Sequence, residues 1–579
     1  MNRIISTTIV AIALFMGGGS LSCSAQSIET ATEAVKNMGL GWNLGNTLDA
    51  NSHRSTDVNS DSYWNCQGLD SEYCWGQKPT TKPLFEMMRE AGFGAIRVPV
   101  TWYNHMTKDG KVNEAWMARV HEVVDMVIES GLYCIINVHH DTGADNDSWT
   151  SWLKADMDTY NNVKNRYEYL WKQIAEEFKD YDEHLLFESY NEMLDIKSSW
   201  CFASFNTSSR YDANIAKSAY DAINSYAQLF VNTVRNTGGN NAQRNLVVNT
   251  YGACCGAGTW NSHLSDPLSQ MNLPEDNVQN HLIFQVHTYP DISSNNLTTI
   301  KAGVDQTINA LKTHLVSKGA PVIIGEWGTA NVDGGDGKTD YDIRRDVMFS
   351  FADYFVKQMK ANDMGTFYWM GLTDGTFRTF PAFSQPDLAE RLAKSYHGED
   401  FNGKWPEYEQ PAVVVCFEGT KPLGWGSGIN IEASVFQNAG EKCELELTYT
   451  QTAYSGDDIQ LYYGNWSDKP SFIVDGKTYV ADFNPSRVYN SGANTDHVTV
   501  FTFPKANYDK IAQLGLIVHG TGITLKKATV TDPDKLAGVV DINDNDDDND
   551  NGVYNLAGQR VNANTKGLLI KNGRKYLNR

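Results

Sequence analysis

Between about residues 36 and 400 the chain alternates short apolar segments with longer amphipathic stretches, and this alternation limits the possible folds. Eight segments have the length and composition of buried strands: residues 38–42, 94–100, 132–138, 184–191, 245–251, 281–289, 321–328 and 365–370. Helical spacing of apolar residues marks stretches between them, including 113–130, 160–180, 212–237, 301–318 and 340–361. Eight strands each followed by a helix predict an α/β fold, a (β/α)8 TIM barrel over residues 27–402. The alternative, a doubly wound open sheet, lacks a glycine-rich phosphate loop after its first strand.

The ends of these strands carry an unusual set of side chains. In a (β/α)8 barrel the C-terminal strand ends form the active site. Seven of them supply polar or aromatic groups here: Trp42 and Asn43, Arg97, His139 and His140, Asn191 and Glu192, His287 and Tyr289, Glu326 and Trp327, and Trp369. So many polar and aromatic groups at one end of a barrel are not explained by core packing alone. These side chains therefore predict a functional site at the barrel mouth.

The pattern changes after residue 403, where a linker leads into period-two alternation. Residues 411–532 predict a smaller β-sandwich, an accessory domain with a short helix near 506–514. Four aromatic residues in it are expected to form either a platform for sugar rings or part of the sandwich core or surface: Trp425, Tyr462, Tyr463 and Trp466.

The last residues divide into an acidic linker and an alternating tail. Residues 533–552 are polar and charged by composition. The spacing within 541–552 weakly resembles a calcium loop but lacks its final ligand. Residues 553–579 predict a C-terminal β-hairpin and resemble the sorting tails of secreted proteins in some Gram-negative bacteria.

The first 25 residues predict export. Arg3 precedes an apolar run from Ile4 to Met16 and then small residues, as in a secretory signal peptide. Cleavage after Ala25 would release a soluble chain, whereas Cys23 would be the lipidated residue of a lipoprotein signal. No later segment has the length and hydropathy to cross a membrane. We therefore expect a protein that is secreted, or located at the cell surface or outer membrane of a Gram-negative bacterium.

Nine cysteines in an exported chain make disulfides possible. Cys66 with Cys74 is the first expected pair, and Cys416 with Cys443 the second. Cys201 is expected to reach Cys254 or Cys255. Cys134 lies in an apolar strand and is expected to be a free core residue, and no cysteine spacing suggests zinc.

Two glutamates at the predicted mouth form a pair that could cleave a glycosidic bond. Glu192 ends the fourth strand and Glu326 the seventh, on opposite sides of the mouth. One carboxyl group can protonate the leaving oxygen while the other attacks or activates water. Tyr289 is expected to hydrogen-bond the nucleophilic carboxylate, and Arg97 to keep it ionised. The two carboxyl groups need different pKa values, so unlike surroundings are expected.

Glu188 lies four residues before Glu192 and is expected to have a different role. In an extended strand the two side chains share a face but lie roughly 13 Å apart along the axis, too far for a reacting pair. Glu188 is therefore predicted to be structural and paired with a buried cation, Arg97.

Seven segments resemble glycoside hydrolase family 5, the retaining β-glycanases, in the expected order over residues 35–400. They are GWNLGNTLDA, WGQKPTTKPLFEMMREAGFGAIRVPVTW, INVHHD, ESYNEM, FQVHTY, IIGEWG and FYWMGLTDG. Glu72-x-Cys-Trp-Gly and the pair His139-His140 most resemble subfamily 4, the endo-β-1,4-glucanases and xyloglucanases. One departure is the turn after the eighth strand, where Met370-Gly371-Leu372 separates Trp369 from Thr373-Asp374-Gly375.

The resemblance implies Glu192 as general acid/base and Glu326 as nucleophile. Arg97, His139, Asn191, His287, Tyr289 and Trp369 match the family's supporting site residues. The implied activity is hydrolysis of internal β-1,4 bonds in cellulose, mixed-linkage glucan or xyloglucan, with no metal or cofactor. A β-mannanase with the same machinery and a catalytically dead surface glycan-binding protein are the alternatives. The net charge of −22 argues against nucleic-acid binding, and we expect a monomer with a polysaccharide as its partner.

Overall fold

The computed structural model describes residues 28–51, 68–73, 75–143, 151–197, 211–257, 262–331, 338–379, 381–408, 412–424, 426–452, 456–480, 482–485, 496–533, 535, 553–555, 560–561, 567–571 and 574–578. The chain forms two compact units, Met1–Tyr408 and Glu409–Arg579. Each unit is described by itself below.

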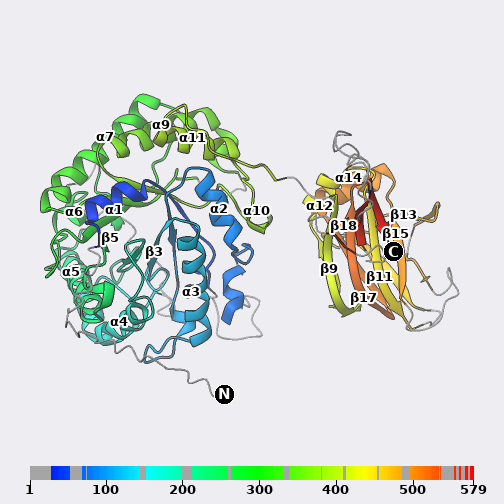
Figure 1. The fold of residues 1–579 in the computed structure, drawn as a ribbon, viewed down its shortest axis with the longest axis horizontal. Coiled ribbons are helices and arrows are strands. Elements are labelled where there is room, and N and C mark those ends of the chain that lie inside the picture. Colours follow the sequence, from blue (N-terminus) through cyan, green and yellow to red (C-terminus); the bar gives the residue numbers. More distant parts are fainter. Residues whose placement is uncertain are drawn as a thin grey trace, which may run out of the picture. The chain divides into compact units, whose positions relative to one another are not determined.

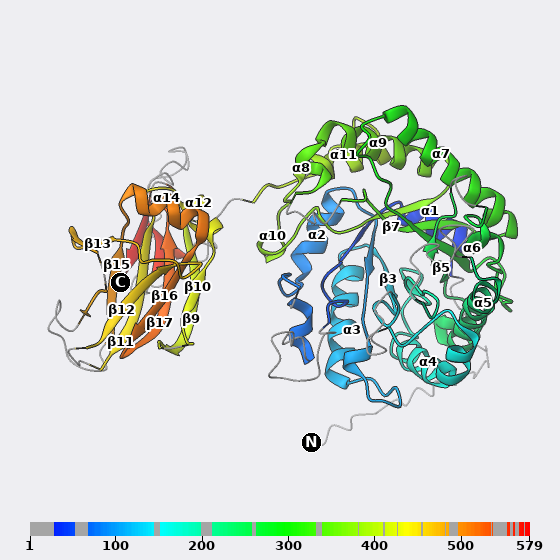
Figure 2. The same cartoon turned by 180° about the vertical axis from the view of Figure 1, so that it is seen from behind.

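The first unit is a closed barrel of eight parallel strands that neighbour one another in chain order, which confirms the predicted (β/α)8 fold (Figures 1 and 2). The strands are β1 (Leu40–Asn43), β2 (Ala95–Val98), β3 (Tyr133–Asn137), β4 (Leu185–Glu188), β5 (Leu246–Cys254), β6 (Leu282–Thr288), β7 (Val322–Trp327) and β8 (Gly365–Tyr368). The seam of the barrel lies between β8 and β1, where Gly41 pairs with Phe367.

Helices surround this barrel in both views (Figures 1 and 2). They are α1 (Ala31–Met38), α2 (Lys82–Glu90), α3 (Glu114–Glu129), α4 (Met157–Glu177), α5 (Ala213–Asn236), α6 (Asp266–Ser269), α7 (Leu297–His314), α8 (Asp340–Ile343), α9 (Arg345–Ala361), α10 (Thr376–Thr379) and α11 (Pro386–His397). Asn113, Asp156 and Asp212 start α3, α4 and α5 by accepting hydrogen bonds from backbone N–H groups of the first turn. The helix predicted over 340–361 divides at Arg344, whose φ of −147° is not helical.

Inside the barrel the side chains change from apolar to polar along the strands. The apolar layer consists of Ala95, Ile135, Leu186, Val247, Ile283, Ile323 and Phe367, and α1 packs against it through Ala31, Val35 and Met38. Side chains two residues further along a strand lie on the same face. Five polar residues follow members of the apolar layer at this spacing, and all are fully buried: Arg97, Asn137, Glu188, Asn249 and Gln285. Strand periodicity therefore builds the base of a polar site directly on an apolar core.

The second unit contains two antiparallel sheets around one core, which confirms the predicted sandwich. The sheets have the orders β10-β16-β12 and β15-β11-β17-β9. Their strands are β9 (Val413–Pro422), β10 (Ile429–Ile431), β11 (Glu444–Gln451), β12 (Asp458–Tyr463), β15 (His497–Phe501), β16 (Leu516–Thr521) and β17 (Ile523–Thr531). A short pair, β13 (Phe472–Val474) and β14 (Lys477–Tyr479), and the helices α12 (Ala433–Ala439) and α14 (Lys505–Leu514) complete the unit. Leu461 and Val518 from one sheet meet Leu447 and Leu525 from the other in a shared apolar cluster.

The predicted disulfide between Cys416 and Cys443 is wrong, because both thiols are free. Cys416 lies on β9 and Cys443 directly precedes β11, and β17 runs between these two strands. Two strand spacings amount to about 9–10 Å, beyond the roughly 7 Å limit between the Cα atoms of a disulfide. Cys134 is a free, buried core residue, as predicted. Cys66, Cys74 and Cys201 lie outside the described residues, so their pairings stay predictions.

Four short strands occupy the C-terminal tail. They are β18 (Val553–Asn555), β19 (Arg560–Val561), β20 (Gly567–Lys571) and β21 (Arg574–Asn578), in the order β19-β18-β20-β21. β20 and β21 form an antiparallel hairpin, and β18 and β19 extend it. Among the described residues, no helix is long and apolar enough to cross a lipid bilayer. The predicted signal at 1–25 and the calcium-like spacing at 541–552 lie outside the described residues.

Candidate active site

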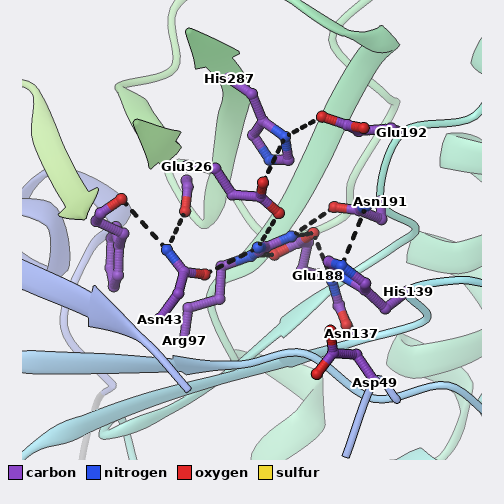
Figure 3. A network of polar contacts seen from close by, with 12 residues as sticks. Asn43, Asp49, Arg97, Asn137, His139, Glu188, Asn191, Glu192, His287 and Glu326 are labelled. Carbon is purple, nitrogen blue, oxygen red and sulfur yellow. Dashed lines mark hydrogen bonds and ion pairs between the residues drawn. The ribbon is translucent and has the colours of Figure 1, made fainter. Parts of the chain in front are cut away.

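Arg97 is the centre of the polar network at the barrel mouth (Figure 3). Its guanidinium is fully buried and donates through Nε and Nη2 to Glu188, at 2.6 and 2.7 Å. Nη1 donates to Glu326 at 2.7 Å and to Asn43 at 3.0 Å. Nη2 also donates to Asn191 at 2.8 Å. One side chain on β2 therefore orients groups from β1, β4 and β7 and from the segment after β4.

The pair of Arg97 and Glu188 confirms the structural role predicted for Glu188. Both side chains are fully buried. Although burial opposes the charged form of each, Arg97 lowers the pKa of Glu188, and Glu188 and Glu326 raise the pKa of Arg97. Asn137 and Asn249 donate further hydrogen bonds to Glu188, at 3.0 and 3.2 Å. Both charges therefore persist in the interior, where a buried ion needs a partner and further hydrogen bonds.

Glu326 receives hydrogen bonds that favour its ionised form. Besides the bond from Arg97, the Tyr289 hydroxyl donates to its Oε2 at 2.8 Å, as predicted. Burial raises the pKa of Glu326, while His287 and Arg97 counteract part of this rise. Its side chain is 6% exposed. The carboxylate is thus fixed in orientation and lies against a cation.

Glu192 lies in a different environment from Glu326. Its Oε1 is 2.8 Å from Nδ1 of His287, and the same nitrogen is 3.6 Å from Oε2 of Glu326 (Figure 3). Burial raises the pKa of Glu192 to about 7. Burial also lowers the pKa of His287 to about 4, so this ring is neutral at pH 7. A carboxyl group that retains a proton near neutrality thus lies beside one that is bound to a cation, an arrangement suited to acid and nucleophilic roles.

Gln285 is a site residue that the sequence interpretation missed. Its Nε2 lies 3.4 Å from Nε2 of His287. An amide N–H donated to Nε2 leaves the ring proton on Nδ1, which faces Glu192. Gly325 on the neighbouring strand leaves room for Gln285, since a Cβ there would lie 2.2 Å from the Gln285 Cδ. The sequence did contain a signal for this residue: Gln285 lies two positions before His287, so the two side chains share one face of the strand.

Two histidines and Trp369 line another part of the mouth. His139 is 3.1 Å from the Asn137 amide, and its ring is parallel to that of Trp369 with centroids 6.0 Å apart. Burial lowers the pKa of His139 well below its usual value. His140 lies 3.6 Å from Asp49, another residue that the sequence interpretation missed. Burial opposes the charged form of His140, but Asp49 raises its pKa.

Asn43 joins the first strand to the last two. Its amide nitrogen donates to the backbone carbonyls of Gly325, Phe367 and Tyr368, at 2.9, 3.2 and 3.3 Å. Since Asn43 also accepts from Arg97, the same side chain connects the barrel seam to the polar network.

The loop after β8 is held by Gln77. The Gln77 amide nitrogen donates to Asp374, and its oxygen accepts from the Gly375 N–H, both at 2.9 Å.

Trp327 does not reach the mouth, contrary to the sequence prediction. Its ring packs on Phe355 of α9, with centroids 4.3 Å apart, and on Tyr368 at 5.1 Å. Neighbouring residues of a strand point to opposite faces, so Glu326 can face the barrel interior only if Trp327 faces the helices. Trp42 is likewise fully buried in the hydrophobic core. The structure brings together the remaining predicted residues: Asn43, Arg97, His139, His140, Asn191, Glu192, His287, Tyr289, Glu326 and Trp369.

Two groups of side chains have the composition of metal ligands. Potential ligand atoms lie within 4.8 Å of one another in Glu192, His287 and Glu326, and likewise in Asp49, His139 and His140. In the first group Arg97 already lies 2.7 Å from Glu326. A divalent cation there would be repelled by the guanidinium, so hydrogen bonding explains this group better than metal binding.

Comparisons with known proteins agree with this geometry. Residues 54–373 match the family model described as "Cellulase (glycosyl hydrolase family 5)". Endoglucanase B of Neocallimastix patriciarum is 34% identical over 382 residues, which are 64% of this chain and 71% of that protein. A solved broad specificity endoglucanase of subfamily 4 from an uncultured bacterium is 60% identical, with a TM-score of 0.61, over 64% of this chain and 97% of that one.

A family 5 enzyme from Prevotella bryantii, solved as a mutant in complex with a xyloglucan tetradecasaccharide, is 38% identical. The structural match covers 64% of this chain and 99% of the Prevotella bryantii chain, with a TM-score of 0.53. The family match spans more than half of the 579 residues and includes strands β2 to β8, while β1, which carries Asn43, precedes it. With its barrel, its paired glutamates and these relatives, the chain belongs to glycoside hydrolase family 5, among the endoglucanases of subfamily 4.

Proposed function

We propose that the barrel hydrolyses internal β-1,4 bonds of glucans with retention of anomeric configuration. The observation that carries this proposal is the spacing of Glu192 and Glu326, which present oxygens within 4.8 Å of each other. Retaining enzymes place their carboxyl groups about 5–5.5 Å apart, and inverting enzymes roughly 6.5–9.5 Å. The short spacing leaves no room for a water between the sugar and Glu326.

In the first step an oxygen of Glu326 attacks the anomeric carbon as the glycosidic C–O bond breaks. Glu192 gives its proton to the departing oxygen. In the second step Glu192 takes a proton from water, the water oxygen attacks the same carbon, and Glu326 departs as a carboxylate. Arg97 and Tyr289 hold Glu326 for both attacks, and His287 orients the carboxyl group of Glu192.

The proposed substrates are cellulose, mixed-linkage glucan and xyloglucan. Support comes from the endoglucanase relatives and from the Prevotella bryantii enzyme, whose structure holds a xyloglucan oligosaccharide. Trp369, which lies parallel to His139 at the mouth, offers an aromatic face for a sugar ring. Because such polymers cannot enter a cell intact, we also propose export through the predicted signal of residues 1–25.

A panel of defined polysaccharides tests the activity and its stereochemistry. We expect new reducing ends from the three β-1,4-glucans and a weaker signal from β-mannan. Proton NMR during the first minutes should show the β-anomer before mutarotation, since double displacement retains configuration. An initial α-anomer would exclude this mechanism. Absence of new reducing ends from every polysaccharide would favour a glycan-binding protein without activity.

The pKa of Glu192 predicts the alkaline limb of the pH profile. Glu192 must be protonated to act as acid, and burial raises its pKa to about 7. The value of kcat/KM on a glucan should therefore fall about tenfold for each pH unit well above 7. The control is an aryl β-glycoside whose leaving group needs no proton, for which this limb should flatten. A kcat/KM on glucan that stays constant up to pH 9 would contradict the assignment.

A further inference from the structure

The outer face of the three-stranded sheet in the second unit carries an aromatic cluster, which consists of the exposed Trp466, the partly buried Tyr462 and the buried His519. Trp466 follows β12 and is 56% exposed. Its ring lies 4.9 Å from that of Tyr462 and 5.9 Å from that of His519. Single exposed apolar residues are common on proteins, so the surroundings of Trp466 decide whether it has a role.

Polar side chains continue from this cluster along β12. In that strand Ile459, Leu461 and Tyr463 face the core, while Asp458, Gln460 and Tyr462 face outward. The Tyr462 hydroxyl donates to Gln460 at 2.9 Å, and the Gln460 amide donates to Asp458 at 3.1 Å. Gln460 also pairs across the sheet with His519. An aromatic surface thus adjoins a row of hydrogen-bonding groups on one face.

The backbone at Trp466 is strained to present the indole. Its φ is +59°, a region that bulky residues rarely adopt. The turn is held by bonds from the Trp466 N–H to the Tyr463 carbonyl and from the Ser467 N–H to the Asn465 side chain, at 2.8 and 3.0 Å. Glycine or asparagine would satisfy the same turn with less strain and less exposed apolar surface. Strain of this kind is often found where a ligand is bound.

We propose that the aromatic cluster and the adjoining row of Gln460 and Asp458 bind a β-1,4-linked glucan chain, at a second site separate from the barrel mouth. A β-glucose ring presents C–H groups on its flat faces and hydroxyls around its edge. The C–H face packs on the indole of Trp466, and the hydroxyls meet the amide and the carboxylate. The proposal rests on the proposed function, because it assumes that the bound polymer is also the substrate.

Charge and size favour this ligand over others. The chain carries a net charge of −22, and Asp458 lies in the row itself. The Lys469 ammonium lies 4.7 Å from the centre of the Tyr462 ring but is paired with Asp482, so a neutral polymer is preferred to an anionic one. One exposed indole with a polar row also offers much less apolar surface than the roughly 800 Å² per partner that a stable protein interface buries. A second point of attachment would raise the effective concentration of polymer near the barrel.

The test uses the full chain carrying Glu326→Gln, so that polymer is bound but not cut, and measures binding to insoluble cellulose and mobility in xyloglucan gels. Adding Trp466→Ala should weaken binding about five- to tenfold, the effect of removing a central aromatic contact. Trp466→Phe should retain part of the binding. Tyr169→Ala, which removes a 40% exposed tyrosine from α4 of the barrel, should change nothing and serves as the matched control.

Hydrolysis separates failure of this site from failure of the proposed function. In the active chain, Trp466→Ala should slow hydrolysis of insoluble cellulose and leave turnover of a short soluble cello-oligosaccharide unchanged. Polymer binding equal to that of the parent would overturn the second site, even if the enzyme cuts glucans. Equal loss on the polymer and on the short oligosaccharide would also overturn it, because the damage would then lie in the barrel. Absence of any glucan hydrolysis by the unmutated chain would instead refute the proposed function.

Discussion

Glu326→Gln should lower kcat on a β-1,4-glucan on the order of 10⁴- to 10⁶-fold, the range seen when a nucleophile is removed. The amide retains the shape of the carboxylate and can still accept from Tyr289, so the barrel should remain folded. It cannot form the glycosyl ester, because a neutral amide is a poor nucleophile. Initial rates on xyloglucan, together with circular dichroism of the variant, provide the measurement.

Glu192→Gln is the matched control, since it changes the other carboxyl group of the pair. This variant should lose hydrolysis of glucan but retain much of the first step on an aryl β-glycoside whose leaving group needs no proton. The two variants should therefore differ on the activated substrate. Substantial turnover by Glu326→Gln on either substrate would exclude Glu326 as nucleophile.

Arg97→Met should cost about 3–5 kcal/mol of barrel stability, because it leaves a buried carboxylate without its counter-charge. Glu188 is fully buried and bound to Arg97 by two hydrogen bonds. Catalysis should also collapse, since Glu326 loses the cation that keeps it ionised. Thermal unfolding of the barrel, followed by circular dichroism, measures the first effect, and kcat on xyloglucan measures the second.

The double variant Arg97→Met with Glu188→Met distinguishes these two effects. Replacing both members of a buried pair by apolar side chains removes the unpaired charge, so part of the stability should return. Activity should not return, because Glu326 still lacks its guanidinium. A double variant no more stable than the single one would show that Glu188 is not the group that Arg97 compensates.

Much of the barrel could be predicted because its signals are local. The eight strands are short apolar runs, and in the helices between them apolar residues recur every three or four positions. The structural role of Glu188 was predicted as well, although β4 ends at Glu188, so the extended strand that was expected to separate it from Glu192 stops there. The same reasoning, applied to Glu326 and Trp327, would have placed Trp327 outside the mouth, since neighbouring residues face opposite sides. The prediction for Trp327 was wrong because it assigned both residues at the end of the strand to the mouth, although only one of two neighbours can face it.

Other features needed the three-dimensional arrangement. Gln285 acts on His287 within one strand, but the space it occupies depends on Gly325 in the next strand. Asp49 meets His140 across loops that are far apart in the sequence. The predicted Cys416–Cys443 disulfide was wrong because β17 lies between β9 and β11 in the sheet. The sequences of β9 and β11 do not reveal this order. Non-local order of this kind leaves no periodic mark in a sequence.

The bonds of Asn43 across the barrel seam have a consequence during synthesis. Asn43 emerges from the ribosome early, yet two of its partners, the carbonyls of Phe367 and Tyr368, are made more than 300 residues later. Until those residues have left the ribosome, the ring cannot close, and Asn43 cannot be held where it meets Arg97. The ring of strands therefore closes only after the last strand has been made, and only then are all these partners of Asn43 in place.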